Sequence, residues 1–155
     1  MNSSIIFLDF DGVLNAEQYQ ARLAMDGKPT RDAWGPLFAP RAVANLRRII
    51  DETDAAIVIS SSWRNLHSLE SLRIMWNVRD LPGEIFDAIP CGTAHISRGD
   101  EIECWLSLHR LTNYVIIDDV NDFYPMQQDR YVETNSIVGI SEADAMRAVE
   151  ILNLK

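Results

Sequence analysis

The sequence predicts an α/β fold: residues 1–155 form a single three-layer domain with a doubly wound, Rossmann-like parallel sheet of about five strands. Two observations lead to this prediction. Short apolar runs rich in β-branched residues alternate along the chain with segments whose apolar residues recur at helical spacing. The most apolar runs end in hydroxyl or carboxylate side chains, as expected where parallel strands end at the same edge of a sheet. A chain of 155 residues is long enough to bury the core of one such domain.

The first predicted strand leads directly into Asp9, Asp11 and Gly12. Its continuous apolar sequence is typical of a buried central strand, so the two carboxylates have to lie where the strand ends. Alternate residues of a strand share a face, so both side chains point the same way if strand geometry continues that far. The next segment, residues 15–40, contains a predicted short helix over Glu17–Met25 and is too short for a separate domain, so we interpret it as a flap.

The remaining elements continue the alternation of helices and strands. Pro40 opens a helix over Arg41–Asp51, and Ser141 with Asp144 forms a capping box for the last helix. The other predicted helices cover Leu66–Trp76 and Asp100–His109, and Arg98 lies just before the second of them. The other predicted strands cover Ala55–Ser60, Ile85–Ile89 and Tyr114–Ile117, and a weak edge strand covers Arg130–Thr134.

Composition excludes several classes of function. A formal net charge of −9 argues against broad non-specific binding of nucleic acid, which depends on many cationic contacts with phosphates. No apolar run approaches the length of a membrane span, and no basic region precedes the first apolar run as it would in a secretory signal. With two cysteines there is no disulfide framework. We therefore expect a cytoplasmic protein that does not associate with membranes.

Polar side chains at the ends of three predicted strands, and one before a helix, should meet at one edge of the sheet. Two carboxylates about 4 Å apart repel by about 4 kcal/mol at an effective dielectric near 20, so a positive group or a shared proton has to relieve them. Several carboxylates in one crevice suit Mg²⁺, which prefers oxygen ligands and is often held together with substrate phosphate. A phosphoryl group bound there invites attack by a free carboxylate. The converging residues are Asp9, Asp11, Ser60, Arg98, Asp118 and Asp119.

With this constellation the sequence resembles the haloacid-dehalogenase-like (HAD) hydrolase superfamily. The run Asp9-Phe10-Asp11-Gly12-Val13 is similar to the first motif, which implies that Asp9 is the nucleophile and Asp11 the general acid and base. The run ending in Ser60 resembles the second motif and implies phosphate binding by Ser60, with Ser61 as the alternative. The run ending in Asp118-Asp119 resembles the fourth motif and implies acidic metal ligands.

The third motif of that superfamily is normally a lysine, and Arg98 is the best candidate here, although arginine differs from lysine in geometry and hydration. More narrowly, the segments DFDGVLN, SSSWR and RGDEIECWL are similar to small capless members related to the phosphatase domains of RNA-repair proteins. The resemblance thus implies a Mg²⁺-dependent phosphomonoesterase that works through Asp9-phosphate. It also implies that Mg²⁺ is held by Asp9, the backbone carbonyl of Asp11, and Asp119 or Asp118.

The expected substrate follows from the missing cap domain. The insert is too short for a cap, and Asn65–Ser97 is taken up by the helix and strand that the core fold itself needs. We therefore expect an open mouth and few contacts to a small metabolite. We therefore expect a large phosphorylated substrate, with a nucleic-acid terminus as the first choice. Arg64 and Trp34 are candidate substrate contacts. The side chains expected to flank the mouth are Arg22, Lys28, Arg31, Arg64 and Arg98.

Other interpretations remain open from the residues alone. A receiver-like phospho-switch needs an aspartate at the end of the third strand, where Ile89 and Pro90 stand instead. A catalytically silent binding module on the same fold, or a phosphatase for small metabolites or nucleotides, is also compatible with the pattern. Individual side chains have alternatives too: the serines at 60–62 can cap the following helix, Arg64 can pair with surface acids, and Asp122 can cap a turn or tune the metal site.

Overall fold

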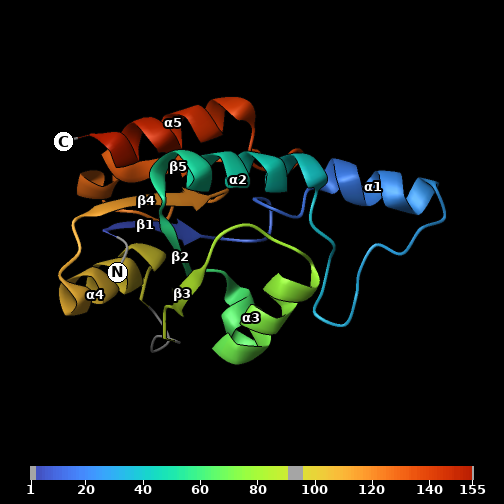
Figure 1. Ribbon diagram of the computed structural model, residues 1–155, viewed down its shortest axis with the longest axis horizontal. Helices are drawn as coiled ribbons and strands as arrows, with labels where there is room; N and C mark the ends of the chain where they lie inside the picture. Colours follow the sequence, from blue (N-terminus) through green and yellow to red (C-terminus); the bar gives the residue numbers. More distant parts are fainter. Residues whose placement is uncertain (1–2, 91–95, 155) are drawn as a thin grey trace.

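The protein is described by a computed structural model for residues 3–90 and 96–154. Its centre is a five-stranded, all-parallel sheet with the order β3-β2-β1-β4-β5 (Figure 1). This order matches the first five strands of the Rossmann order 3-2-1-4-5-6 and differs from the 2-1-3-4-5 order of receiver-like domains. The predicted fold class is confirmed. The strands are β1 (Ser4–Leu8), β2 (Ala56–Ile59), β3 (Ile85–Ala88), β4 (Asn113–Asp118) and β5 (Tyr131–Glu133).

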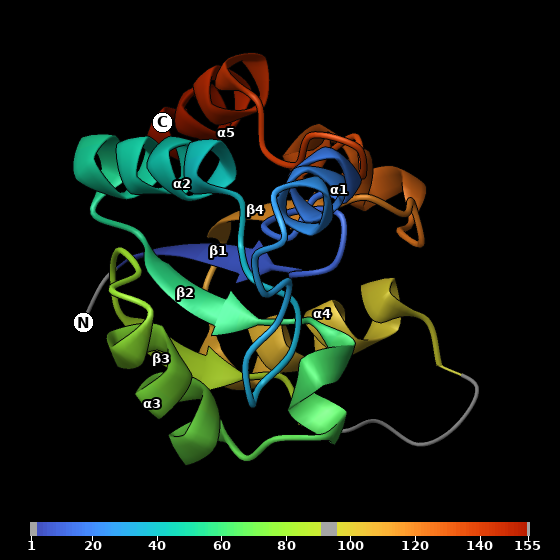
Figure 2. The ribbon, with the colours of Figure 1, turned by 90° about the vertical axis from the view of Figure 1, so that its right-hand side faces the viewer.

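Helices connect the strands and cover both faces of the sheet (Figures 1 and 2). Among the described residues, no helix is both long and apolar enough to pass through a membrane. The α-helices are α1 (Glu17–Met25), α2 (Pro40–Thr53), α3 (Leu69–Val78), α4 (Arg98–His109) and α5 (Glu142–Asn153), and the 3-10 helices are η1 (Ser62–Asn65) and η2 (Pro125–Arg130).

The core lies in two layers, one on each face of the sheet. On one face, Ile6 and Leu8 of β1 pack with the buried side chains of α2, α3 and α5. On the other face, Phe7 packs edge-on against Trp105 of α4, with ring centroids 5.4 Å apart. β1 is buried along its whole length, as a central strand covered on both faces has to be.

Two helix boundaries differ from the predictions because local caps decide them. Ser68 accepts a hydrogen bond from the backbone N–H of Ser71, so α3 begins at Leu69, three residues after the predicted start. Ser97 and Asp100 form a capping box, so α4 begins at Arg98. Arg98 therefore belongs to the first turn of the helix, whereas the sequence analysis placed it just before the start.

The register of the sheet brings the ends of three strands level. Leu8 of β1 lies opposite Ile59 of β2 and Ile117 of β4. The backbone N–H groups that follow continue the ladder, because Asp9 donates to Ile117 and Ser60 donates to Leu8. The next residues of the three strands, Asp9, Ser60 and Asp118, thus reach the same edge of the sheet side by side.

The insert of residues 15–40 contributes one short helix and a loop rather than a cap. α1 extends beyond the carboxyl edge of the sheet (Figure 1). Its first N–H groups donate to backbone carbonyls of Ser136 and Ile137, and Gln20 donates to the carbonyl of Leu37. Within the described residues, no large cap domain lies over the carboxyl edge of the sheet.

The loop of the insert is attached to the end of α3 by one arginine. Arg79 donates to both carboxylate oxygens of Asp32, at 2.9 and 2.7 Å, and these hydrogen bonds lower the pKa of Asp32. It also donates to the backbone carbonyls of Gly35 and Pro36, and its guanidinium lies 4.6 Å from the ring centre of Phe38. The side chain of Arg79 is 8% exposed, so little of its charge is left to water.

We predict that Arg79→Ala destabilises the protein by about 3 kcal/mol, because it leaves Asp32 and two carbonyls without their buried cationic partner. The measurement is the free energy of unfolding in urea at neutral pH. Arg48→Ala is the matched control, since Arg48 forms an exposed i,i+4 pair with Glu52 and should cost no more than about 0.5 kcal/mol. Equal losses of unfolding free energy in the two variants would show that the contacts of Arg79 with Asp32, Gly35 and Pro36 do not stabilise the loop.

Candidate active site

A cavity of about 370 Å³ opens at the carboxyl edge of the sheet, and we call it the site cavity. It collects side chains from the loop after β1, the turn after β2, the start of α4 and the loop after β4. Five of the predicted site residues line it together. The lining residues are Asp9, Asp11, Ser62, Arg98, Asp118, Asp119, Val120 and Asp122.

Three carboxylates form the floor of this cavity. One oxygen from each of Asp9, Asp118 and Asp119 lies within 4.8 Å of the other two, and we call these residues the carboxylate cluster. Asp9 and Asp118 are 8% and 5% exposed, so the repulsion between them is weakly screened by water. Arg98 partly offsets it, with a guanidinium nitrogen 3.5 Å from Asp118.

Burial and charge together make Asp9 and Asp118 hard to ionise. Burial, followed by the negative charge of Asp118, raises the pKa of Asp9 to about 8, although Arg98 acts in the opposite direction. Burial also raises the pKa of Asp118. One arginine is therefore too little positive charge for this cluster. Because the donors are all carboxylate oxygens, a hard divalent cation such as Mg²⁺ fits the site.

Asp11 stands apart from the carboxylate cluster although it lines the same cavity. Its Oδ1 accepts hydrogen bonds from Asn15 Nδ2 at 2.7 Å and from Trp63 Nε1 at 3.1 Å. Asn15 is itself fixed, since its Oδ1 accepts the backbone N–H of Gly12 at 3.0 Å. Both donors bind the same oxygen, Oδ1, and so fix the orientation of the Asp11 carboxylate. The side chain of Asp11 thus lies outside the group of three clustered carboxylates, and its orientation is set by Asn15 and Trp63.

The sequence analysis did not find Asn15 or the polar contact of Trp63. The available signal was the DGVLN run, in which Asn15 follows Asp11 by four residues across a tight turn. The ring of Trp63 is buried in the core. Its indole N–H nevertheless reaches Asp11, a contact between residues 52 positions apart that no local pattern reveals.

Gly12 is required in the turn for two reasons. Its φ of +76° lies in the region that only glycine adopts without strain. A Cβ at this position would also lie 2.3 Å from a carboxylate oxygen of Asp119. The backbone of the turn therefore passes directly against one member of the carboxylate cluster, and Thr134 holds it there by a 2.8 Å hydrogen bond to the carbonyl of Gly12.

The three serines after β2 have different positions. Ser60 is fully buried, and its hydroxyl has no hydrogen-bond partner among the described residues. Ser61 is also fully buried, and its hydroxyl accepts the backbone N–H of Trp63, so it caps η1. Ser62, which the sequence analysis did not select, is the serine that lines the site cavity. The phosphate-binding roles expected for Ser60 and Ser61 stay predictions.

The start of α4 contributes one cation and one acid to the site cavity. Asp122 accepts the backbone N–H of Arg98 at 2.9 Å, and its own carbonyl accepts the N–H of Gly99. Asp122 thus satisfies the first N–H groups of α4, which is the capping alternative, while it also lines the cavity. Arg98 contacts Glu101 at 3.5 Å as well as Asp118, so both acids direct its guanidinium.

Arg64 does not flank the mouth of the cavity, and that expectation is corrected. Its side chain is only 6% exposed, it pairs with Glu101 at 2.7 Å, and it donates to the carbonyl of Ser60. A buried guanidinium needs such partners, which explains why the side chain points inward. Glu101 therefore connects Arg64 and Arg98, and its role was not apparent from the sequence.

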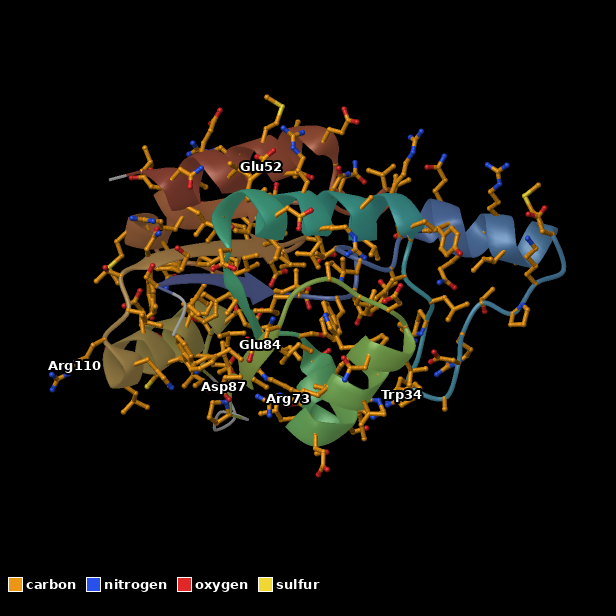
Figure 3. All side chains as sticks on the ribbon, in the orientation of Figure 1. Trp34, Glu52, Arg73, Glu84, Asp87 and Arg110 are labelled. Carbon is orange, nitrogen blue, oxygen red and sulfur yellow. The ribbon has the colours of Figure 1, made fainter. Side chains whose placement is uncertain are left out.

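The expected contacts from the insert also lie away from the site cavity. Trp34 lies beside α3 (Figure 3), where its Nε1 donates to the hydroxyl of Ser71 and its carbonyl contacts His67. It does not line the site cavity, and neither do Arg22, Lys28 or Arg31. Arg98 is the single cation among the described residues of the lining, so the predicted cationic rim is not present around this cavity.

Comparisons with known proteins agree with the motifs. A family model described as the HAD domain in Swiss Army Knife RNA repair proteins matches residues 5–145. The solved structure of a haloacid dehalogenase-like family hydrolase from Streptococcus pneumoniae is similar, with a TM-score of 0.50 and 15% sequence identity over 95% of this chain and 90% of that chain. At this level of identity the similarity shows the fold alone. A search of curated proteins gave no significant match. Because the family match spans most of the chain and every residue of the site cavity, the chain belongs to the family of HAD domains in Swiss Army Knife RNA repair proteins.

Proposed function

We propose that this hydrolase is a Mg²⁺-dependent phosphomonoesterase that forms an aspartyl-phosphate on Asp9. The observation that carries the proposal is the carboxylate cluster, whose burial and mutual repulsion call for a divalent cation. Asp11 lies in the same cavity, held by Asn15 and Trp63. A nucleophilic carboxylate and a separately oriented second carboxylate are the two groups that this reaction needs.

Two steps account for the reaction. In the first step, an oxygen of Asp9 bonds to phosphorus, the bond from phosphorus to the leaving oxygen breaks, and Asp11 gives that oxygen a proton. In the second step, Asp11 takes a proton from water and the water oxygen bonds to phosphorus. The bond between Asp9 and phosphorus then breaks, which releases inorganic phosphate and restores the carboxylate of Asp9.

The remaining groups stabilise charge around the phosphoryl group. Asp9, Asp118 and Asp119 are the side chains that would hold Mg²⁺, with the backbone carbonyl of Asp11 as a predicted further ligand. The cation supplies positive charge to the phosphoryl oxygens and neutralises the cluster. Arg98 adds the protein's own positive charge. The unpaired hydroxyl of Ser60, next to Asp9 in the sheet, is suited to donate to a phosphoryl oxygen.

The proposed substrate is a phosphate at a nucleic-acid end. Two features support this choice: the described residues contain no cap domain that would enclose a small metabolite, and the family description names RNA repair proteins. The cytoplasmic location expected from the sequence stays a prediction.

We predict that Asp9→Asn lowers phosphate release to the background rate, because the amide has no anionic oxygen to attack phosphorus. Asp11→Asn should slow turnover by about 10²–10⁴-fold, the usual contribution of a general acid or base. It should also trap the phosphoprotein, since the amide oxygen still accepts from Asn15 and Trp63 but cannot activate water. The assay is phosphate release from p-nitrophenyl phosphate with Mg²⁺, and the trapped form is detected by mass spectrometry of the intact protein.

Asp51→Asn is the control for both substitutions, because it removes an exposed carboxylate of α2 far from the cavity. It should retain wild-type turnover. Wild-type rates in Asp9→Asn would rule out the covalent mechanism.

We predict that the metal-free protein loses stability as the pH rises from about 4 to about 8. Asp9 ionises near 3.8 when unfolded but only near 8 when folded, so within this window the unfolded state releases the proton first. Mg²⁺ should restore stability above pH 7, by about 2.7 kcal/mol at 100 times its dissociation constant. Thermal unfolding in chelator and across a Mg²⁺ titration, at constant ionic strength, measures both effects.

Asp119→Ala should leave the stability of the metal-free protein equal or higher, because it removes one of three repelling charges, and it should abolish the response to Mg²⁺. Ca²⁺ and Na⁺ titrations test whether the response is specific. An unfolding midpoint that does not change over the whole Mg²⁺ titration contradicts the proposed metal site.

We predict that Asn15→Ala lowers kcat by up to about 100-fold, because Asp11 loses the shorter of its two hydrogen bonds and its proton is misplaced. The loss should be larger for an alkyl phosphate than for p-nitrophenyl phosphate, since a poor leaving group depends more on protonation. A general structural defect would lower both rates by the same factor. Trp63→Phe keeps the ring but removes the second donor, so it should reproduce the same dependence on the leaving group.

A further inference from the structure

One buried arginine contacts two of the segments that form the site cavity. Arg64, in η1 after β2, donates to Oε2 of Glu101 in α4 at 2.7 Å and to the backbone carbonyl of Ser60 at 3.2 Å. Its side chain is 6% exposed and does not line the site cavity. We propose that Arg64 is a positioning residue for the phosphoryl group, which keeps Arg98 available through Glu101 and fixes the backbone of Ser60.

This inference deepens the proposed function and rests on it, because it assumes that the phosphoryl group binds in the site cavity beside Arg98. Arg98 is the single cation among the described lining residues, so the binding of an anion there depends on how the charge of Arg98 is directed. Arg64 is absent from the lining, so it can act on the phosphoryl group only through the residues that it contacts.

The two arginines contact the same oxygen of Glu101 at different distances. Arg64 Nη2 lies 2.7 Å from Oε2, which is the length of a charge-assisted hydrogen bond, whereas Arg98 Nε lies 3.5 Å from it. The side chain of Glu101 is only 11% exposed, so water does little to screen its charge. If Arg64 were removed, the carboxylate of Glu101 would therefore draw the guanidinium of Arg98 toward itself and away from the cavity.

The pairing of Arg64 with Glu101 leaves the positive charge of Arg98 for the site cavity. The contacts of Arg98 with Glu101 and Asp118 both measure 3.5 Å and involve its Nε and Nη1. Neither acid therefore holds the guanidinium in a short hydrogen bond, and a guanidinium has five N–H donors with which to bind an anion. Removal of Arg64 would leave Arg98 paired with Glu101, and the network of three charges would become neutral.

The second contact of Arg64 fixes the end of β2, from which the hydroxyl of Ser60 projects. The backbone N–H of Ser60 donates to the carbonyl of Leu8 at 3.0 Å, and its carbonyl accepts from Arg64, so both backbone polar groups of Ser60 are bonded. Its hydroxyl is buried and has no hydrogen-bond partner among the described residues. Arg64 thus connects the two protein groups that are proposed to contact phosphoryl oxygens, the hydroxyl of Ser60 and the guanidinium of Arg98.

An ion pair that only joins η1 to α4 would have the same distances, and removal of one partner of a buried pair is destabilising in either case. The two explanations differ in the effect of a second substitution. If the pair is only structural, Glu101→Gln cannot repair the loss of Arg64. If Arg64 serves to occupy Glu101, then Glu101→Gln restores the binding of an anion, because the neutral amide no longer competes for Arg98.

The test is the dissociation constant of inorganic phosphate in the presence of Mg²⁺, measured by isothermal titration calorimetry for Arg64→Met, Glu101→Gln and the double variant. We expect Arg64→Met to weaken phosphate binding by about tenfold and the double variant to bind within about threefold of the wild type. Glu101→Gln alone should bind at least as tightly as the wild type, which tests the proposal even if Arg64→Met does not fold. Equal weakening in Arg64→Met and the double variant, or weaker binding by Glu101→Gln, overturns the proposal.

Arg130→Met is the matched control, because it removes the same charge and also a donor to a strand carbonyl, that of Tyr114 near the start of β4. Arg130 does not line the site cavity, so this variant should bind phosphate as the wild type does. Unfolding in urea checks that each variant is folded under the conditions of the titration. Equal weakening in Arg130→Met and Arg64→Met would reduce the effect to net charge and overturn the proposal.

Phosphate binding separates this inference from the proposed function. If the wild type hydrolyses p-nitrophenyl phosphate and Arg64→Met binds phosphate as tightly as the wild type, the proposed function is retained and the positioning role of Arg64 is lost. If the variants bind phosphate in the expected order but the wild type hydrolyses no phosphate ester, the positioning role is retained and the phosphatase activity is lost. A wild type that does not bind phosphate at all overturns both.

Discussion

The mutual repulsion of Asp9, Asp118 and Asp119 is the constraint on which the site depends. Three carboxylates with oxygens within 4.8 Å of one another repel, so a positive charge or a shared proton has to offset the repulsion. The backbone next to them is correspondingly specialised: Gly12 passes so close to Asp119 that no side chain fits there. The protein thus tolerates an unstable arrangement at one edge of the sheet, and the rest of the domain has to supply the rigidity that keeps it in place.

That rigidity comes from the sheet. β1 is buried on both faces and paired with β2 and β4 in a level register, so the residues that follow the three strands have little freedom to move apart. Short loops carry the reactive groups, while Phe7 and its neighbours in the core fix where those loops begin. Stability and reactivity thus come from different parts of the domain. Burial of apolar side chains in the core provides the stability, and the carboxyl edge of the sheet contributes little to it, so the clustered charges can lie there.

The sequence predicted the fold class and the convergence of the strand ends because both follow from local pattern. An apolar run followed by Asp9 predicts a buried strand that ends in a carboxylate, whatever residues it later contacts. The capping box that begins α5 is likewise recognised from neighbouring residues alone. The errors concern contacts between distant segments. Arg64 points inward because Glu101, 37 residues away, pairs with it, so this arginine does not flank the site cavity as expected. Asp11 is oriented by Trp63 across 52 residues, which periodicity cannot reveal.

Net charge and local charge act in opposite directions on the proposed substrate. The chain carries −9, and its site cavity contains one arginine among four lining aspartates of the motifs, so the long-range field repels a polyanion. At physiological ionic strength that field is screened beyond about 8 Å, whereas direct contacts between phosphate and guanidinium persist at shorter range. Recognition of the proposed nucleic-acid end would then depend on cations within contact distance of it, such as Arg98, which lines the site cavity and lies 3.5 Å from Asp118.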